Sequence, residues 1–121
     1  MDLVTELKKI LGTGRYDLQD EKVIQMQISD ALTAPDINHV RELRLSPKDI
    51  IDFYLPTCDE NGIGIEIKLS GNAKIIYKQL ERYCKYPQIS EIILITNKTI
   101  GLPKAILGKP THIIKLGRAW L

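Results

Sequence analysis

The chain has 121 residues, of which 44% are hydrophobic and 26% charged, and its formal net charge is +2. This length and balance predict one globular domain and exclude a disordered chain. The longest apolar run, Ile92–Ile95, is far shorter than the roughly 20 residues that span a bilayer, and we expect no membrane partner. Cys58 and Cys84 form no metal-binding or disulfide motif, so we expect a reducing, cytoplasmic setting.

Two helices are predicted in the first third of the chain. Apolar residues recur every three or four positions in residues 2–12 and again in residues 18–33, which is the spacing of an amphipathic helix. Gly12 and Gly14 end the first segment, and Pro35 ends the second.

Three strands are predicted next. Residues 38–45 alternate weakly between apolar and polar positions, residues 50–55 alternate more clearly, and residues 63–69 alternate most regularly. Residues 56–62 contain Pro, Asp, Glu, Asn and Gly, a composition that predicts a hairpin connection between the second and third strands.

The remaining elements are one helix and two strands. Asn72 is a plausible cap for a helix over residues 73–86, which Pro87 ends. Residues 91–96 are almost entirely apolar, as in a central strand that is covered on both faces, and residues 112–116 form a final strand. The fold class predicted by this order is α/β, with a mixed sheet flanked by helices.

The charges are distributed unevenly along the chain. Residues 1–60 hold seven Lys and Arg against twelve Asp and Glu, a net charge of −5, whereas residues 61–121 hold ten against three, a net charge of +7. This asymmetry suggests carboxylates that gather a cation and a basic surface that binds a polyanion. Ordinary solvated charge is the alternative explanation.

Strand alternation predicts which side chains share a face. Ile51 and Phe53 are expected on one face of their strand and Asp52 on the other. Glu66 and Lys68 are two residues apart on the next strand, so they share a face, which Asp52 can also reach from the hairpin partner. Parity therefore favours Asp52 over Asp49 as the acid that accompanies Glu66.

The carboxylates of Asp52 and Glu66, side by side on neighbouring strands, predict a cation site. They repel each other unless a cation neutralises them, and Mg²⁺ prefers such hard oxygen ligands. A neighbouring Lys68 can hold a water molecule or a phosphate oxygen, which metal-assisted phosphodiester hydrolysis requires. The alternative is a solvent-exposed charged face on which Lys68 bridges Asp52 and Glu66.

This order of elements and motifs resembles the PD-(D/E)xK nuclease superfamily, over residues 18–96. That superfamily has an αβββαβ, restriction-endonuclease-like core with Asp on its second strand, (D/E)-x-K on its third and often Gln on the next helix. The matching residues here are Asp52, Glu66-Ile67-Lys68 and Gln79. The likeness is closest to small Holliday-junction-resolvase-like and VRR-type members. Ile51 precedes Asp52 where the family motif has Pro, which makes the match less specific.

The resemblance implies roles for individual residues. The implied ligands of Mg²⁺ or Mn²⁺ are Glu21, Asp52, Glu66 and the backbone carbonyl of Ile67. Lys68 would orient the attacking water and stabilise charge on the phosphate. Gln79 would support the site, although a half-buried amide at a helix–sheet contact explains it equally well.

A basic ridge is predicted beside this site. Its residues are Lys74, Lys78, Arg82 and Lys85, which recur at helical spacing and are candidates for contact with nucleic-acid phosphates. An exposed helix face is the alternative. Tyr83, at the same helix, is expected to pack rather than to stack on bases.

The sequence thus indicates a single-domain, Mg²⁺- or Mn²⁺-dependent nuclease over residues 1–121. It would hydrolyse DNA, with branched and single-stranded DNA among the candidate substrates. Recognition would be structure-selective or non-sequence-specific, because so small a domain offers little surface for sequence readout. The resemblance also implies a homodimer. The alternatives are a catalytically inactive binding or inhibitory protein of the same fold, and a structural protein in which the charged residues form salt bridges only.

Overall fold

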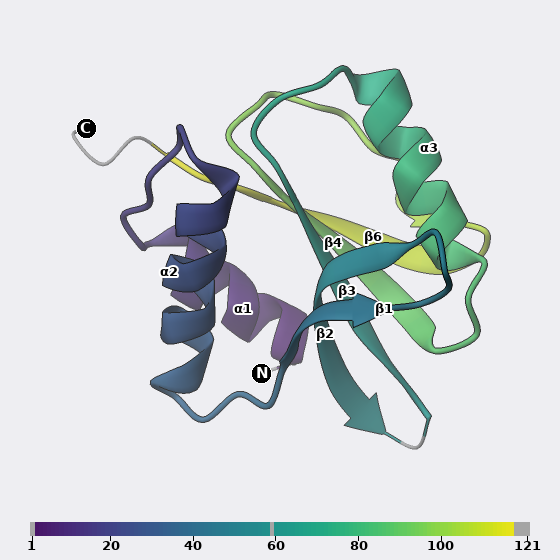
Figure 1. The fold of residues 1–121 in the computed structure, drawn as a ribbon, viewed down its shortest axis with the longest axis horizontal. Coiled ribbons are helices and arrows are strands. Elements are labelled where there is room, and N and C mark those ends of the chain that lie inside the picture. Colours follow the sequence, from purple (N-terminus) through teal and green to yellow (C-terminus); the bar gives the residue numbers. More distant parts are fainter. Residues whose placement is uncertain (1, 59, 118–121) are drawn as a thin grey trace.

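Six strands form the centre of the structure, a computed structural model that describes residues 2–58 and 60–117 (Figure 1). The helices are α1 (Leu3–Gly12), α2 (Glu21–Thr33) and α3 (Ala73–Cys84). The strands are β1 (Val40–Arg44), β2 (Ile50–Cys58), β3 (Asn61–Lys68), β4 (Ile89–Thr96), β5 (Ala105–Ile106) and β6 (Lys109–Lys115). The predicted α/β class is confirmed, and α2 to β4 follow one another in αβββαβ order.

The sheet combines an antiparallel and a parallel part. Its strand order is β1-β2-β3-β4-β6-β5. The β1–β2 and β2–β3 pairs are antiparallel, whereas β3, β4 and β6 run parallel to one another. The last five residues of β4, 92–96, are all buried, as expected for a central strand covered on both faces.

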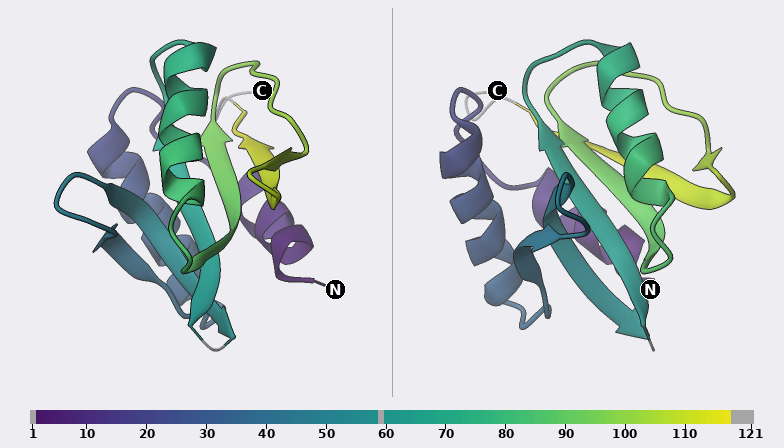
Figure 2. Two further views of the ribbon diagram at one scale, coloured as in Figure 1. Left: turned by 90° about the vertical axis from the view of Figure 1, so that its right-hand side faces the viewer. Right: turned by 45° about the vertical axis from the view of Figure 1, so that its right-hand side comes forward.

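Helices cover both faces of this sheet (Figure 2). On one face, α1 and α2 pack their apolar stripes against residues such as Phe53, Ile65 and Ile95. On the other face, α3 packs against residues such as Ile51 and Leu94. None of the helices in residues 2–58 and 60–117 has the length and apolarity needed to cross a membrane.

Several predicted boundaries were wrong. β2 continues to Cys58 and β3 begins at Asn61, so most of the predicted 56–62 connection belongs to the hairpin strands. This close pairing depends on Gly62, because a Cβ there would collide with the backbone carbonyl oxygen of Leu55. The prediction also missed β5 and the first three residues of β6, and α3 ends two residues earlier than expected.

The predicted alternation along β2 was wrong at Ile51, the residue before Asp52. Phe53 packs in the core beneath α1 and α2, as predicted for its face, but Ile51 packs with the core beneath α3. The ladder between β2 and β3 reaches the Phe53–Ile65 pair and does not extend to Asp52 and Glu66. The two strands separate at this point. Without the pairing, β2 twists, and its side chains no longer alternate strictly between the two faces of the sheet.

Candidate functional site

Where β2 and β3 separate, hydrogen bonds to the side chains of Asp52 and Glu66 take the place of bonds between the two backbones. The Asp52 backbone N–H donates to Glu66 Oε1 (3.3 Å). In the reverse direction, the Ile67 backbone N–H donates to Asp52 Oδ2 (2.8 Å). The predicted meeting of Asp52 and Glu66 is therefore confirmed, and each side chain is held by the backbone of the other strand.

Glu66 lies deep in the structure. Only 3% of its surface is exposed, so Glu66 does not lie on the solvent-exposed charged face of the alternative interpretation, although the ion pair with Lys68 that it included is present. Its Oε2 lies 3.5 Å from Lys68 Nζ and accepts from the Tyr83 hydroxyl (3.4 Å). Burial, and then the charge of Asp52, raise the pKa of Glu66 to about 8, against the opposing effect of Lys68.

Asp52 shares this environment. Burial raises its pKa above the ordinary value, and the charge of Glu21 acts in the same direction. The hydrogen bond from Ile67 and the charge of Lys68 oppose the rise. The pair therefore resists holding two negative charges without a neutralising partner.

Helix α2 brings two side chains to the same edge. The Glu21 carboxylate accepts from the Leu69 backbone N–H (3.1 Å), directly after β3. One turn later, the buried Gln25 donates from Nε2 to Asp52 Oδ1 (3.0 Å). Gln25 was not predicted as a site residue, although its spacing of four residues from Glu21 was a usable signal.

Helix α3 supports Glu66 from the opposite side. Tyr83, which is 1% exposed, donates to the Ile50 carbonyl (3.0 Å) or to Glu66. Gln79 Nε2 donates to the Tyr83 hydroxyl (2.9 Å), so Gln79 reaches the site through Tyr83. Burial and the nearby carboxylates raise the pKa of Tyr83, which keeps its hydroxyl protonated as a donor. Its packing was predicted, but its contact with Glu66 was not.

Asp49 belongs to a separate network. Its carboxylate pairs with Arg82 Nε (3.2 Å) and accepts from the Tyr86 hydroxyl (2.8 Å). These bonds attach the turn between β1 and β2 to α3. The parity argument that favoured Asp52 over Asp49 therefore selected the acid that contacts Glu66. The other three residues of the predicted basic ridge are exposed: Lys74, Lys78 and Lys85. The guanidinium group of Arg82 forms an ion pair with Asp49, so it is less available to a phosphate.

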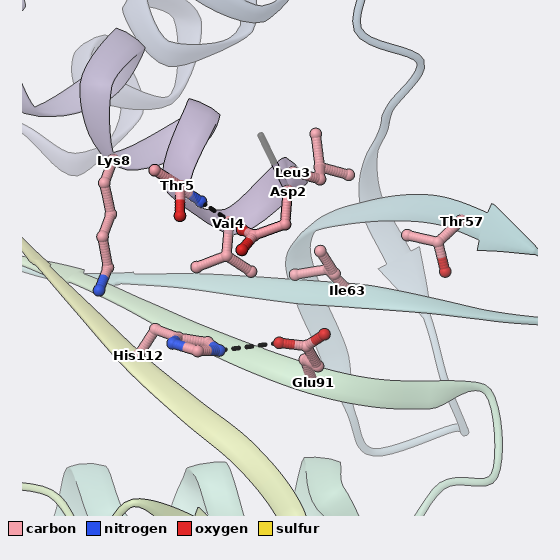
Figure 3. A pocket seen from close by; sticks show the side chains of 9 residues that line it. All are labelled: Asp2, Leu3, Val4, Thr5, Lys8, Thr57, Ile63, Glu91 and His112. Carbon is pink, nitrogen blue, oxygen red and sulfur yellow. Dashed lines mark hydrogen bonds and ion pairs between the residues drawn. The ribbon is translucent and has the colours of Figure 1, made fainter.

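A pocket of about 380 Å³ lies between α1 and the sheet, and none of the residues discussed above lines it (Figure 3). His112 Nε2 pairs with Glu91 Oε2 at 2.8 Å on its floor. Asp2 caps α1 by accepting from the Thr5 backbone N–H (2.8 Å). Glu91 and Asp2 are thus both bonded to other residues that line the pocket, His112 and Thr5.

The donor set of the candidate site suits a hard divalent cation. Two carboxylates and the nearby Ile67 backbone offer oxygen ligands, and a cation would relieve the repulsion that raises both pKa values. Within residues 2–58 and 60–117, no three His, Cys, Asp or Glu side chains gather closely enough to hold a metal ion. Glu21 thus forms no three-carboxylate cluster with Asp52 and Glu66, and its role as a ligand stays a prediction.

Comparisons with protein-family models, with curated proteins and with solved structures found no match to this chain. The geometry of the site and the motif resemblance are therefore what point to a function.

Proposed function

We propose that this protein is a divalent-metal-dependent nuclease that hydrolyses phosphodiester bonds of DNA. The observation that carries the proposal is the buried cluster of Asp52, Glu66 and Lys68 at the point where β2 and β3 separate. Burying two carboxylates against each other is unfavourable for the folded chain. Such an arrangement is typical of sites that bind a cation for chemistry.

Asp52, Glu66 and the Ile67 carbonyl would hold Mg²⁺ or Mn²⁺. The bound cation would supply charge neutralisation and water activation at the phosphate. The chain itself restrains the two carboxylates with backbone N–H groups and excludes bulk water from Glu66. Lys68, whose side chain is 26% exposed, is placed to orient a water molecule and to stabilise the negative charge that develops on the phosphate.

A row of basic residues extends from this site along the ends of the parallel strands. Lys68 pairs in register with Thr96, and Thr96 with Lys115, so the two lysine Cα atoms are about 10 Å apart at two strand spacings. Lys115 alternates with Ile114 and Leu116, which pack beneath α1 and α2, so it faces the α3 side with Lys68. Lys98 follows β4 at the same end of the sheet. Lys68, Lys98 and Lys115 thus give this end a basic surface that would suit a polyanion.

Cleavage of a DNA panel tests the proposed function. Labelled linear, nicked, branched and single-stranded DNAs are incubated with Mg²⁺, with Mn²⁺ and with chelator. We expect cleavage with metal only, and a loss of at least about 100-fold in Asp52→Asn, because metal sites depend strongly on each ligand. Asp49→Asn is the matched control, because Asp49 is a buried acid directly before β2 that pairs with Arg82 outside the site.

The outcomes separate the candidate functions. If the folded wild type cleaves none of the DNAs, the nuclease proposal is wrong. Metal binding without cleavage would instead support a binding protein of the same fold. Equal activity in Asp52→Asn and the wild type would place the chemistry elsewhere.

Salt-dependent DNA binding distinguishes the two basic surfaces. In an Asp52→Asn background, which prevents cleavage, we compare Lys98→Ala/Lys115→Ala with the ridge variant Lys78→Ala/Lys85→Ala. Each lost phosphate contact reduces the slope of log affinity against log salt by about 0.7–0.9. We expect a reduction of roughly 1.4–1.8 for the strand-end pair. The larger reduction in the ridge variant would instead place the DNA along α3.

A further inference from the structure

Gln25 carries a buried oxygen that has no partner among the described residues. The residue is 5% exposed, and its Nε2 donates to Asp52 Oδ1 at 3.0 Å. Its Oε1 is inaccessible to solvent and accepts no hydrogen bond from residues 2–58 and 60–117. Native proteins satisfy most buried acceptors, because an unsatisfied one forfeits its hydrogen bonds to water. The unpaired oxygen therefore points to a group that binds there.

The position of Gln25 beside Asp52 indicates which group would bind to its Oε1. Gln25 lies one helical turn after Glu21, and both side chains reach the edge where β2 and β3 separate. The two polar atoms of Gln25 belong to one planar carboxamide, so Oε1 lies next to the group that contacts Asp52. A hydrated cation held by Asp52 and Glu66 would present water O–H donors close by, since Mg²⁺ retains several of its waters in proteins.

We propose that Gln25 is a positioning residue for the divalent cation: its Nε2 fixes Asp52, and its Oε1 accepts a hydrogen bond from a water molecule of the hydrated cation. This inference rests on the proposed function. It adds α2 to the elements that build the site, through an amide that the motif resemblance does not include.

Direct metal binding tests the role of Gln25 without nucleic acid. Calorimetric titration with Mn²⁺ compares the full-length wild type, Gln25→Met and Gln27→Met. Gln27 is the matched control, because it is a glutamine of the same helix whose Oε1 accepts from the Asp17 backbone N–H (2.9 Å). We expect Gln25→Met to weaken Mn²⁺ binding by about 10–100-fold, as for other residues that orient ligands, and Gln27→Met to leave it within about twofold.

Two outcomes would overturn this role, and they are distinguishable. If the wild type and Gln25→Met bind Mn²⁺ equally, Gln25 does not position the cation, while the proposed function stands. If the wild type binds no Mn²⁺, the metal-dependent function falls together with the inference.

A second measurement applies if Gln25→Met does not fold. In the ¹⁵N-labelled wild type titrated with Mg²⁺, the side-chain NH₂ resonances of Gln25 are expected to shift together with the Ile67 amide resonance. The Gln27 NH₂ resonances are expected to stay in place. A shift of the Ile67 resonance without one at Gln25 would overturn the inference.

Discussion

Replacing Lys68 with Met is expected to reduce kcat for DNA cleavage by about 10²–10³-fold, the usual effect of removing one preorganised charge-stabilising group. The aliphatic stem is kept, and the charge 3.5 Å from Glu66 Oε2 is lost. Because Lys68 lowers the pKa of both carboxylates, its removal raises these pKa values, and it leaves a more negative proposed metal site only once both carboxylates are ionised. Divalent-cation affinity should therefore fall near neutral pH and be maintained or increased only well above about pH 8, while kcat falls.

Steady-state kinetics and Mn²⁺ titration measure these two effects separately. Lys98→Met is the control, because Lys98 follows β4 near the same edge, whereas the lysine that pairs with Glu66 is Lys68. It should alter KM or salt dependence more than kcat. A Lys68→Met protein that is folded and cleaves at the wild-type rate would exclude Lys68 from the chemistry.

Without metal, the wild type is expected to lose about 2–5 kcal/mol of unfolding free energy between about pH 5 and pH 9 through Glu66. The folded-state pKa of Glu66, about 8, lies above its ordinary value of 4.5. Within this window the folded protein holds a proton that the unfolded chain releases. The contribution of Glu66 to the unfolding free energy is therefore fully present below the ordinary pKa of 4.5. It is lost as the pH rises through the folded-state pKa of about 8.

Glu66→Gln should flatten this pH profile. The amide stays neutral at every pH in the window and can still accept from the Asp52 backbone N–H. Urea unfolding in chelator, followed by circular dichroism, measures the difference, with Glu81→Gln on α3 as the control. Added Mg²⁺ should stabilise the wild type more at pH 9 than at pH 5, because the cation competes with the proton. Parallel profiles for the wild type and Glu66→Gln would contradict this account.

Much of the fold followed from local patterns in the sequence. Helical spacing located all three helices, and the cap at Asn72 was correct, since its side chain accepts from the Ile75 backbone N–H. Strand β4 was recognised as central because residues 91–96 are almost entirely apolar, as in a strand whose two faces are both covered. The hairpin between β2 and β3 was misjudged, because turn-forming residue types there take part in strand pairing once Gly62 allows the backbones to approach.

The candidate site was predictable where it depended on strand spacing, and hidden where it depended on tertiary packing. Spacing brought together Asp52, Glu66 and Lys68. No local pattern shows that β2 and β3 separate at Asp52, which moves Ile51 to the other core. The contributions of Gln25 and Tyr83 also arise only when α2 and α3 pack on opposite faces of the sheet.

Each of the two carboxylates accepts a hydrogen bond from the other strand, Glu66 from the Asp52 backbone N–H and Asp52 from the Ile67 backbone N–H, and this has a consequence for how the chain can evolve. A substitution at either position alters both the proposed chemistry and the attachment of one strand to the other, so drift there is constrained even after activity is lost. Lys68 pairs with a side chain, and no strand depends on that ion pair. In a lineage that keeps the fold for binding alone, Lys68 should therefore be substituted before Asp52. Asp52 should be retained because its hydrogen bonds hold β2 to β3.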